Sequence, residues 1–175
     1  MVAQPSLETP RLVLRPFDPT DASAVQRLAG DERVASMAEH IPHPYEDGMA
    51  EEWISGHASA WNDGREATFA VRERSGEALV GCVALRIVPR HARASLGYWT
   101  GQAYWKRGYC TEAASALVEF GFARLALNRI EAVHLLCNPA SGAVMRKLGM
   151  QREGVFRSYL RRDGRSEDVA QYAIL

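Results

Sequence analysis

Hydrophobic and polar positions in the first third of the chain change from a strand period to a helical one. A short apolar strand is expected over Leu12–Leu14, closed by Pro16. Apolar residues then recur at helical spacing from a start signal at residues 19–21 up to Gly30. A second helical pattern runs over Met49–Trp61. Two helices are therefore predicted before the main group of strands.

The remaining pattern places most of the strands in the second half of the chain. Residues 31–47 contain prolines and histidines and predict a loop around a short helix over 34–39. The later elements are expected in this order: strands over Thr68–Arg72, Ala78–Ile87 and Arg93–Thr100, a helix after Gly108, a strand over Ile130–Leu136, a helix over Ala140–Leu148, and strands over Gln151–Leu160 and Asp168–Leu175 joined by a turn at Asp163 and Gly164. This order predicts an α+β fold, with a mostly antiparallel mixed sheet and helices on both faces, in a single domain over residues 1–175.

Composition narrows the class of protein without naming a reaction. The chain has 175 residues, 47% of them hydrophobic and 24% charged, as expected for one globular domain. Its 21 basic and 21 acidic residues balance, so nothing favours nucleic acid or a membrane as a partner. The N-terminal segment lacks a secretory pattern, which predicts a cytoplasmic protein. The three cysteines and five histidines stand apart in sequence, so neither a disulfide framework nor a metal site is expected.

Residues 105–113, here called the anion loop, carry the first candidate chemistry. They join a predicted strand to a predicted helix, whose first turn leaves its backbone N–H groups unpaired. Gly108 allows a ligand to approach the backbone closely, and Lys106 and Arg107 add positive charge. Thr111 adds a hydroxyl within the first turn. The segment suits a pyrophosphate, although an ordinary turn with solvated charges has the same composition.

Two motifs in this order resemble the GCN5-related N-acetyltransferases (GNATs), and among them the RimJ/RimL-like group that acetylates ribosomal protein N-termini. The likeness begins at Thr9–Arg15 and continues through Leu96–Trp99 and Tyr104–Ala113, which is similar to the family's pyrophosphate loop. The more specific motif is Asn138–Gly149, followed by Glu153 and Gly154. Together they cover nearly the whole chain.

The resemblance implies a sheet of about seven strands with a V-shaped split, between the strand ending at Thr100 and the strand Ile130–Leu136. Acetyl-CoA would bind in that split as cosubstrate, without a metal, and its pantetheine would pair with the strand edge near residues 96–100. The residues that the resemblance assigns to the cofactor are Leu96, Tyr98, Trp99, Thr100, Lys106, Arg107, Gly108, Tyr109, Cys110, Thr111, Asn138 and Ser141.

The resemblance also raises the question of which groups move protons. Many family members have a catalytic Tyr at the position of Met145, so Ser141 is the nearest candidate acid, with a helix-cap role as the alternative. The position where related enzymes often carry a carboxylate is Ser95. Other carboxylates, Glu52, Glu112 and Asp168, are more typical of solvated or structural charges. Cys110 and Cys137 are interpreted as buried structural thiols because direct transfer needs no nucleophile.

The acceptor is the least determined part of this interpretation. An α-amine has a pKa of about 7.7 to 8.0 and a lysine about 10.4, so deprotonating the lysine costs about 3.5 kcal/mol more at neutral pH. A site without a dedicated base therefore favours a protein N-terminal α-amine, attacking directly in a ternary complex. A small amine (an aminoglycoside, polyamine or amino acid) stays an alternative, supported by the acidic residues Glu46, Asp47, Glu51 and Glu52. A non-catalytic acyl-CoA-binding module is a further one, and homodimer formation is left open.

Overall fold

The fold is built on one open sheet of eight strands. The computed structural model describes residues 3–76, 78–162 and 164–175. Its strands are β1 (Leu7–Glu8), β2 (Leu12–Arg15), β3 (Glu66–Glu73), β4 (Leu79–Val88), β5 (Arg93–Thr100), β6 (Arg129–Leu135), β7 (Gln151–Arg162) and β8 (Arg165–Ile174). They are ordered β1-β2-β3-β4-β5-β6-β8-β7, and every neighbouring pair except β5 and β6 is antiparallel. The predicted α+β class and mixed sheet are confirmed, with eight strands instead of about seven because the two-residue β1 has no periodic pattern.

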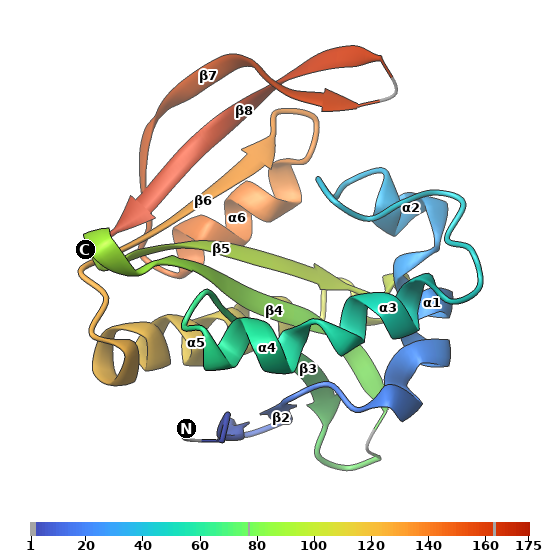
Figure 1. Cartoon of the computed structure of the whole chain (residues 1–175). Coiled ribbons are helices and arrows are strands. Elements are labelled where there is room, and N and C mark those ends of the chain that lie inside the picture. The colour runs from blue at the N-terminus through green and yellow to red at the C-terminus, as the bar shows by residue number, and fades with distance from the viewer. Residues whose placement is uncertain (1–2, 77, 163) are drawn as a thin grey trace.

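Helices cover both faces of this sheet (Figure 1). They are α1 (Ala22–Ala29), α2 (Glu32–Ala35), α3 (Met49–Ser55), α4 (His57–Asn62), α5 (Tyr109–Leu125) and α6 (Pro139–Lys147). Successive residues of β3 point to opposite faces. Phe69 therefore packs in the larger core with Leu117 of α5, whereas Ala70 packs in a smaller core with Val25 of α1 and Ile54 of α3. No helix among the described residues is long and apolar enough to cross a membrane.

The sheet opens between β5 and β6. These two parallel strands pair only from Arg93 with Arg129 to Ser95 with Glu131. Beyond Ser95 they diverge, and β5 continues along β4 alone while β6 continues along β8. The V-shaped split expected at this place is therefore present. It leaves one edge of β5 from residue 96 onward without a neighbouring strand in the described part of the chain.

The predicted element boundaries differ from the structure in two helical regions. The single helix expected over Met49–Trp61 is two helices that meet at Gly56, a residue with poor helix propensity. The short helix expected over 34–39 begins earlier, because the Asp31 side chain accepts from the Arg33 amide at 2.9 Å and caps α2 there. Strands β7 and β8 also extend further than predicted, and Asp163 of their turn lies outside the described residues.

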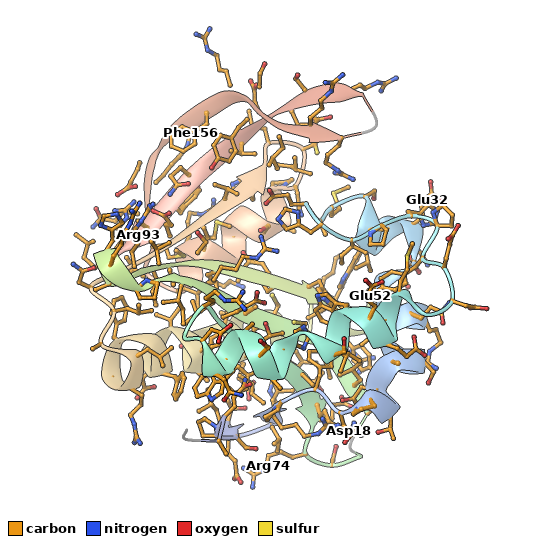
Figure 2. All side chains as sticks on the ribbon, viewed as in Figure 1. Asp18, Glu32, Glu52, Arg74, Arg93 and Phe156 are labelled. Atoms are coloured by element: carbon orange, nitrogen blue, oxygen red, sulfur yellow. The ribbon has the colours of Figure 1, made fainter. Side chains whose placement is uncertain are left out.

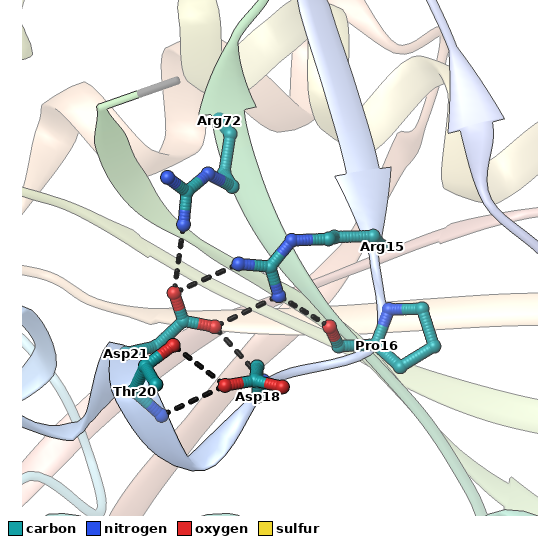
Figure 3. Close-up of polar contacts among 6 residues, drawn as sticks. All are labelled: Arg15, Pro16, Asp18, Thr20, Asp21 and Arg72. Carbon is teal, nitrogen blue, oxygen red and sulfur yellow. Dashed lines mark hydrogen bonds and ion pairs between the residues drawn. The ribbon is translucent and has the colours of Figure 1, made fainter.

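A buried carboxylate attaches α1 to the sheet (Figure 3). Asp21, only 3% exposed, accepts from Arg15 of β2 at 2.8 and 2.9 Å and from Arg72 of β3 at 2.8 Å. Its carboxylate also accepts from the backbone amide of Asp18. Removing one partner of a buried pair typically costs about 3 to 5 kcal/mol, because an uncompensated charge is left behind. This network holds the start of α1, whose residue Val25 lines the cavity described next.

Candidate active site

A cavity of about 740 Å³, called the split cavity here, lies where β5 and β6 diverge. Its walls come from β4, β5, β6 and β8, from α1 and α3, and from the segment after α2. Figure 1 shows the hairpin of β7 and β8 extending beyond β6 on one side of this region, with α2 and α3 on the other. Tyr159 and Leu160 of β7 also contribute to the lining. The cavity is large enough for the reacting ends of two small substrates.

A hydrogen-bonded pair connects the two arms of the split. The Tyr98 hydroxyl on β5 donates to the backbone carbonyl of Ser141 at 3.0 Å, and Ser141 Oγ lies 2.9 Å from the same hydroxyl. Both residues line the cavity. Burial raises the pKa of Tyr98 well above the usual range, although its bond to Ser141 lowers the pKa slightly. The phenol therefore keeps its proton at neutral pH, and the pair can hold a proton beside the cavity.

Local sequence explains why Ser141 stands at this point. Asn138 ends the turn after β6, and its side chain accepts from the Ser141 amide at 3.2 Å. Pro139 occupies the first turn of α6, where a missing N–H costs nothing. The cap therefore places Ser141 in the first turn of α6, facing Tyr98. Asn138 itself is half-buried and is not part of the cavity wall.

Several carboxylates reach the cavity, and two of them are already engaged. Glu131 of β6 is paired with Arg93 at 2.9 Å and with Arg129 at 3.1 Å. Glu66 of β3 accepts a hydrogen bond from the Thr68 hydroxyl. Both residues line the cavity. Because the two arginines balance Glu131, this carboxylate is better suited to holding the β5–β6 junction than to taking a proton.

The three carboxylates left as candidates by the sequence separate in space. Glu52 of α3 lines the cavity and is exposed (Figure 2). Glu112 instead lies in the first turn of α5, and Asp168 accepts from the Ser158 amide at 2.8 Å outside the cavity lining. Of the three, Glu52 alone belongs to the split cavity as the described residues define it.

The anion loop has a backbone shape that is set by contacts from the N-terminal segment. Lys106 and Gly108 both have left-handed φ angles, of 62° and 80°. Arg11 donates to the carbonyl of Arg107 at 2.9 Å and to Glu112 at 2.7 Å. Thr9 donates its hydroxyl to the same carboxylate at 2.6 Å. The segment before β2 therefore holds both ends of the turn at once.

The start of α5 presents free backbone donors. The Glu112 amide donates to the Gly108 carbonyl at 3.0 Å, whereas the amides of Tyr109, Cys110 and Thr111 have no acceptor among the described residues. An unpaired first turn with a positive dipole end is a suitable anion site. Glu112 adds a negative charge here, but its hydrogen bonds to Arg11 balance it. Burial raises the pKa of Glu112, and the bonds from Thr9 and Arg11 outweigh burial and lower it overall.

The structure groups the predicted site residues into two places. Leu96, Tyr98, Trp99 and Ser141 line the split cavity, whereas the loop residues Lys106 to Thr111 lie outside its lining. Thr100 stands between the two places, and its carbonyl accepts from the Trp105 indole at 2.9 Å.

The two cysteines of interest differ from each other. Burial raises the pKa of the Cys110 thiol to about 12, so almost no thiolate is present at neutral pH. Cys137, expected to be buried, is exposed in the turn before α6. The expectation of a buried Cys137 is wrong because the turn after β6 runs over the surface.

Gln171 is one of the cavity residues that sequence reasoning missed. Gln171 of β8 lines the cavity and is only 6% exposed. The feature of the sequence that points to it is a single amide side chain within the otherwise apolar or aromatic run Val169–Ile174. A strand buried on both faces rarely contains such a residue without a partner. The pattern could have been noticed, but no local rule says what the amide faces.

Residues 11–151 match the acetyltransferase (GNAT) domain family. The chain belongs to the GNAT family. A GNAT relative, the uncharacterised N-acetyltransferase YoaA of Bacillus subtilis (strain 168), is 31% identical over 98% of this chain and 97% of its own. The family is one of N-acetyltransferases, so this chain is a transferase of that class.

Solved GNAT structures share the fold over their whole length. A candidate ribosomal-protein-serine acetyltransferase from Vibrio cholerae has a TM-score of 0.84 at 28% identity, covering 100% of this chain and 99% of its own. The ribosomal L7/L12 α-N-protein acetyltransferase RimL, solved with coenzyme A, has a TM-score of 0.85 at 19% identity, covering 98% of each chain. At that identity the likeness to RimL establishes the fold alone.

Proposed function

We propose that this GNAT protein transfers the acetyl group of acetyl-CoA to the α-amine of a peptide or protein N-terminus, by direct attack in a ternary complex. The observation that carries the proposal is the split cavity, because it joins an open strand edge, the Tyr98–Ser141 pair and a free carboxylate, Glu52, in one space. The relative from Vibrio cholerae supports a protein acceptor by its description as a ribosomal-protein-serine acetyltransferase.

The chain's own residues fit acetyl-CoA at both ends of the cofactor. The unpaired amides of residues 109–111 and the charges of Lys106 and Arg107 suit a pyrophosphate. The unpaired β5 edge after Ser95 suits the amides of a pantetheine arm, in the manner of an added strand. When bound, acetyl-CoA would supply an activated acetyl group.

Ser141 is the proposed catalytic acid. Its hydroxyl lies at the cavity wall and shares a hydrogen bond with the neutral phenol of Tyr98. In this role Ser141 Oγ would hold a proton for the departing thiolate, and Tyr98 would orient that hydroxyl. Glu52 would attract the ammonium form of the acceptor into the cavity, from which a proton must leave before attack.

A thiol-release assay with acetyl-CoA tests this function. The acceptor panel contains tetrapeptides with free N-termini, N-blocked lysine peptides and spermidine. We expect the tetrapeptides to be the best acceptors, and Ser141→Ala to lower kcat about 100-fold, a typical contribution of acid–base catalysis. Ser115→Ala, on the exposed face of α5, is the matched control. A lysine peptide turned over far faster than every N-terminal peptide would contradict the acceptor assignment.

A small cationic amine is the second candidate acceptor. Glu52 and Glu39 both line the cavity, and neither is bonded to an arginine among the described residues. Glu39 lies 3.3 Å from His40 Nε2, and two carboxylates without an arginine favour a ligand with more than one positive charge. In the same panel, a spermidine rate above that of every peptide would establish this candidate. Acetyl-CoA binding without thiol release from any acceptor would instead support a non-catalytic binding module.

A further inference from the structure

Gln171 has a position that the proposed chemistry does not explain. It lies in the middle of β8, opposite Val133 of β6 on one side and Gly154 of β7 on the other. Its neighbours Ala170 and Tyr172 belong to the larger core. Because side chains alternate along a strand, Gln171 points to the other face, where it lines the split cavity together with Val133.

Gln171 is a mostly buried residue whose carboxamide has no hydrogen-bond partner among the described residues. The side chain is 6% exposed, and residues 3–76, 78–162 and 164–175 provide no hydrogen bond to it. The other buried polar residues behave differently, since Asp21 is bonded to two arginines and Thr68 to Glu66. The fully buried unpaired side-chain atoms among the described residues are the two ring nitrogens of His57, and the Gln171 amide is not one of them. The Gln171 amide therefore still reaches the cavity, where it is available to a ligand.

The surroundings leave room for such a ligand. Gly154, directly opposite on β7, has no side chain, and a Cβ built there would meet nothing within 4 Å. Tyr159 and Leu160 of β7 line the same cavity, so the space in front of Gln171 is continuous with the one in front of Ser141. Gln171 thus stands on the β6–β8 arm of the split, across from the β5 edge.

We propose that Gln171 binds the acceptor by hydrogen bonds to a peptide group next to the reacting amine. A carboxamide offers one acceptor oxygen and two donor hydrogens side by side, which matches the N–H and C=O of a peptide unit. A simple ammonium has donors only, and the cavity carboxylates already serve it. This inference rests on the proposed acetyltransferase function, and it names the residue that would recognise a peptide acceptor.

Gln171→Met tests the inference, because methionine keeps the length and removes the amide. The acceptors are the tetrapeptide Ser-Ala-Ala-Ala and its analogue with an ester in place of the first peptide bond. We expect the wild type to have an acceptor KM about tenfold lower for the peptide than for the ester, and Gln171→Met to abolish this difference with the KM for acetyl-CoA unchanged. Gln151→Met, at the exposed start of β7, is the control.

Thermal unfolding separates this role from a structural one. Because the amide has no partner among the described residues, Gln171→Met should unfold at the same temperature as the wild type or at a higher one. A lower unfolding temperature together with a retained peptide preference would overturn the inference, and so would an unchanged acceptor KM in an active Gln171→Met enzyme.

The failure of the proposed function is distinguishable from these results. If the wild type releases no thiol with any amine, the function itself fails, and the inference fails with it. If the wild type is active but prefers spermidine and Gln171→Met leaves every acceptor KM unchanged, the transferase function stands and only the peptide-binding role is lost. A wild type that does not distinguish the peptide from its ester contradicts the role as well.

Discussion

The anion loop and the split cavity are organised in opposite ways. At the loop, the exposed Arg11 donates hydrogen bonds to the Arg107 carbonyl and to the Glu112 carboxylate. In the cavity, Gln171 is a mostly buried residue whose amide has no partner among the described residues, and Glu52 is unpaired there. The loop has its donors fixed in advance, whereas the cavity keeps polar groups open for a partner.

This difference follows from what each place must recognise. A cofactor is the same in every reaction cycle, so a rigid set of amides lowers the entropy lost on binding. An acceptor is recognised by polar groups of the protein that give up water when any ligand binds. A molecule that cannot form hydrogen bonds with these groups leaves them unpaired, so it binds more weakly. Substitutions at the loop should therefore change cofactor binding, and substitutions in the cavity should change rate and acceptor choice.

The largest effect is expected from Gly108→Asp. The substitution adds a negative charge at the anion loop and forces a Cβ onto a φ of 80°, where it would meet Arg11 Nη2 at 3.3 Å. Backbone strain and charge repulsion together should reduce the binding free energy of acetyl-CoA by about 2.7 kcal/mol, which weakens binding about 100-fold. Titration calorimetry measures this change. Gly64→Asp, at a φ of 65° with open space, is the strain control. Equal affinity in both variants would place the pyrophosphate elsewhere.

Tyr98→Phe should reduce kcat about tenfold while acetyl-CoA affinity stays the same. The variant keeps the ring and removes the hydroxyl that orients Ser141 Oγ across the split. Steady-state rates with a tetrapeptide acceptor measure the effect. Tyr172→Phe is the control, because its hydroxyl contacts Arg146 on the other face of the sheet. If the two variants were equally active, the Tyr98–Ser141 pair would be structural only.

Glu112→Gln should raise the KM for acetyl-CoA about threefold and leave kcat unchanged, since Arg11 would hold the loop less firmly.

The Glu112 carboxylate also makes a pH-dependent contribution to the stability of the fold. Its pKa is lowered by folding, so its contribution is complete above the unfolded value of about 4.3 and disappears as the pH falls through the folded value.

Chemical unfolding at pH 7 and pH 3 measures this contribution. Wild type and Glu112→Gln should differ at pH 7, and the difference should become smaller at pH 3. Glu119→Gln, on the exposed face of the same helix, should behave like the wild type at both values. A stability difference as large at pH 3 as at pH 7 would mean that packing, and not charge, connects Thr9, Arg11 and Glu112.

The smallest effect is expected at His57, which packs against the cavity residue Trp53. His57 packs on Trp53 at 4.4 Å between ring centroids, and both ring nitrogens are buried without a partner among the described residues. Burial lowers the pKa of His57, so the folded state resists protonation. The contribution of neutral His57 to folding stability is complete above the pKa of about 6.5 that the residue has in the unfolded chain. It is lost as the pH falls below that value.

His57→Phe should therefore raise the unfolding temperature at pH 5 by about 2 °C and leave it nearly unchanged at pH 8. Thermal unfolding followed by circular dichroism at both pH values gives the comparison. His91→Phe, at an exposed position, should change neither value. A gain at pH 8 as large as that at pH 5 would show that better packing, and not the removal of a titrating group, stabilises the variant.

Much of the fold was predictable because its signals are local. Gly30, Gly108 and Gly149 mark helix ends or starts at positions that the structure keeps, and the strands from Thr68 to Thr100 form the expected antiparallel meander. The misplaced boundaries, at α2 and at Gly56, depend on a single cap and a single weak residue. Such features change an element by one turn without changing the pattern around it.

The sequence offered candidates for the cofactor side of the site and few for the acceptor side. The anion loop and the Asn138–Ser141 cap are short continuous segments, so residue type and spacing, together with the family resemblance, were sufficient to name them, and their role in cofactor binding stays a prediction. Gln171 and Glu66 came from strands far apart in the sequence, and neither has a local signature of binding.

The sequence by itself determined the strands and helices, the family and the loop that suits an anion, because each is encoded by neighbours along the chain. The tertiary structure decided which polar side chains share the split cavity and which of them are left unpaired. The pairing of β6 with β8 sets Gln171 beside Val133, and the divergence of β5 from β6 after Ser95 opens the space that it faces. Both depend on long-range strand register, which is set by packing the whole sheet and not by any one segment.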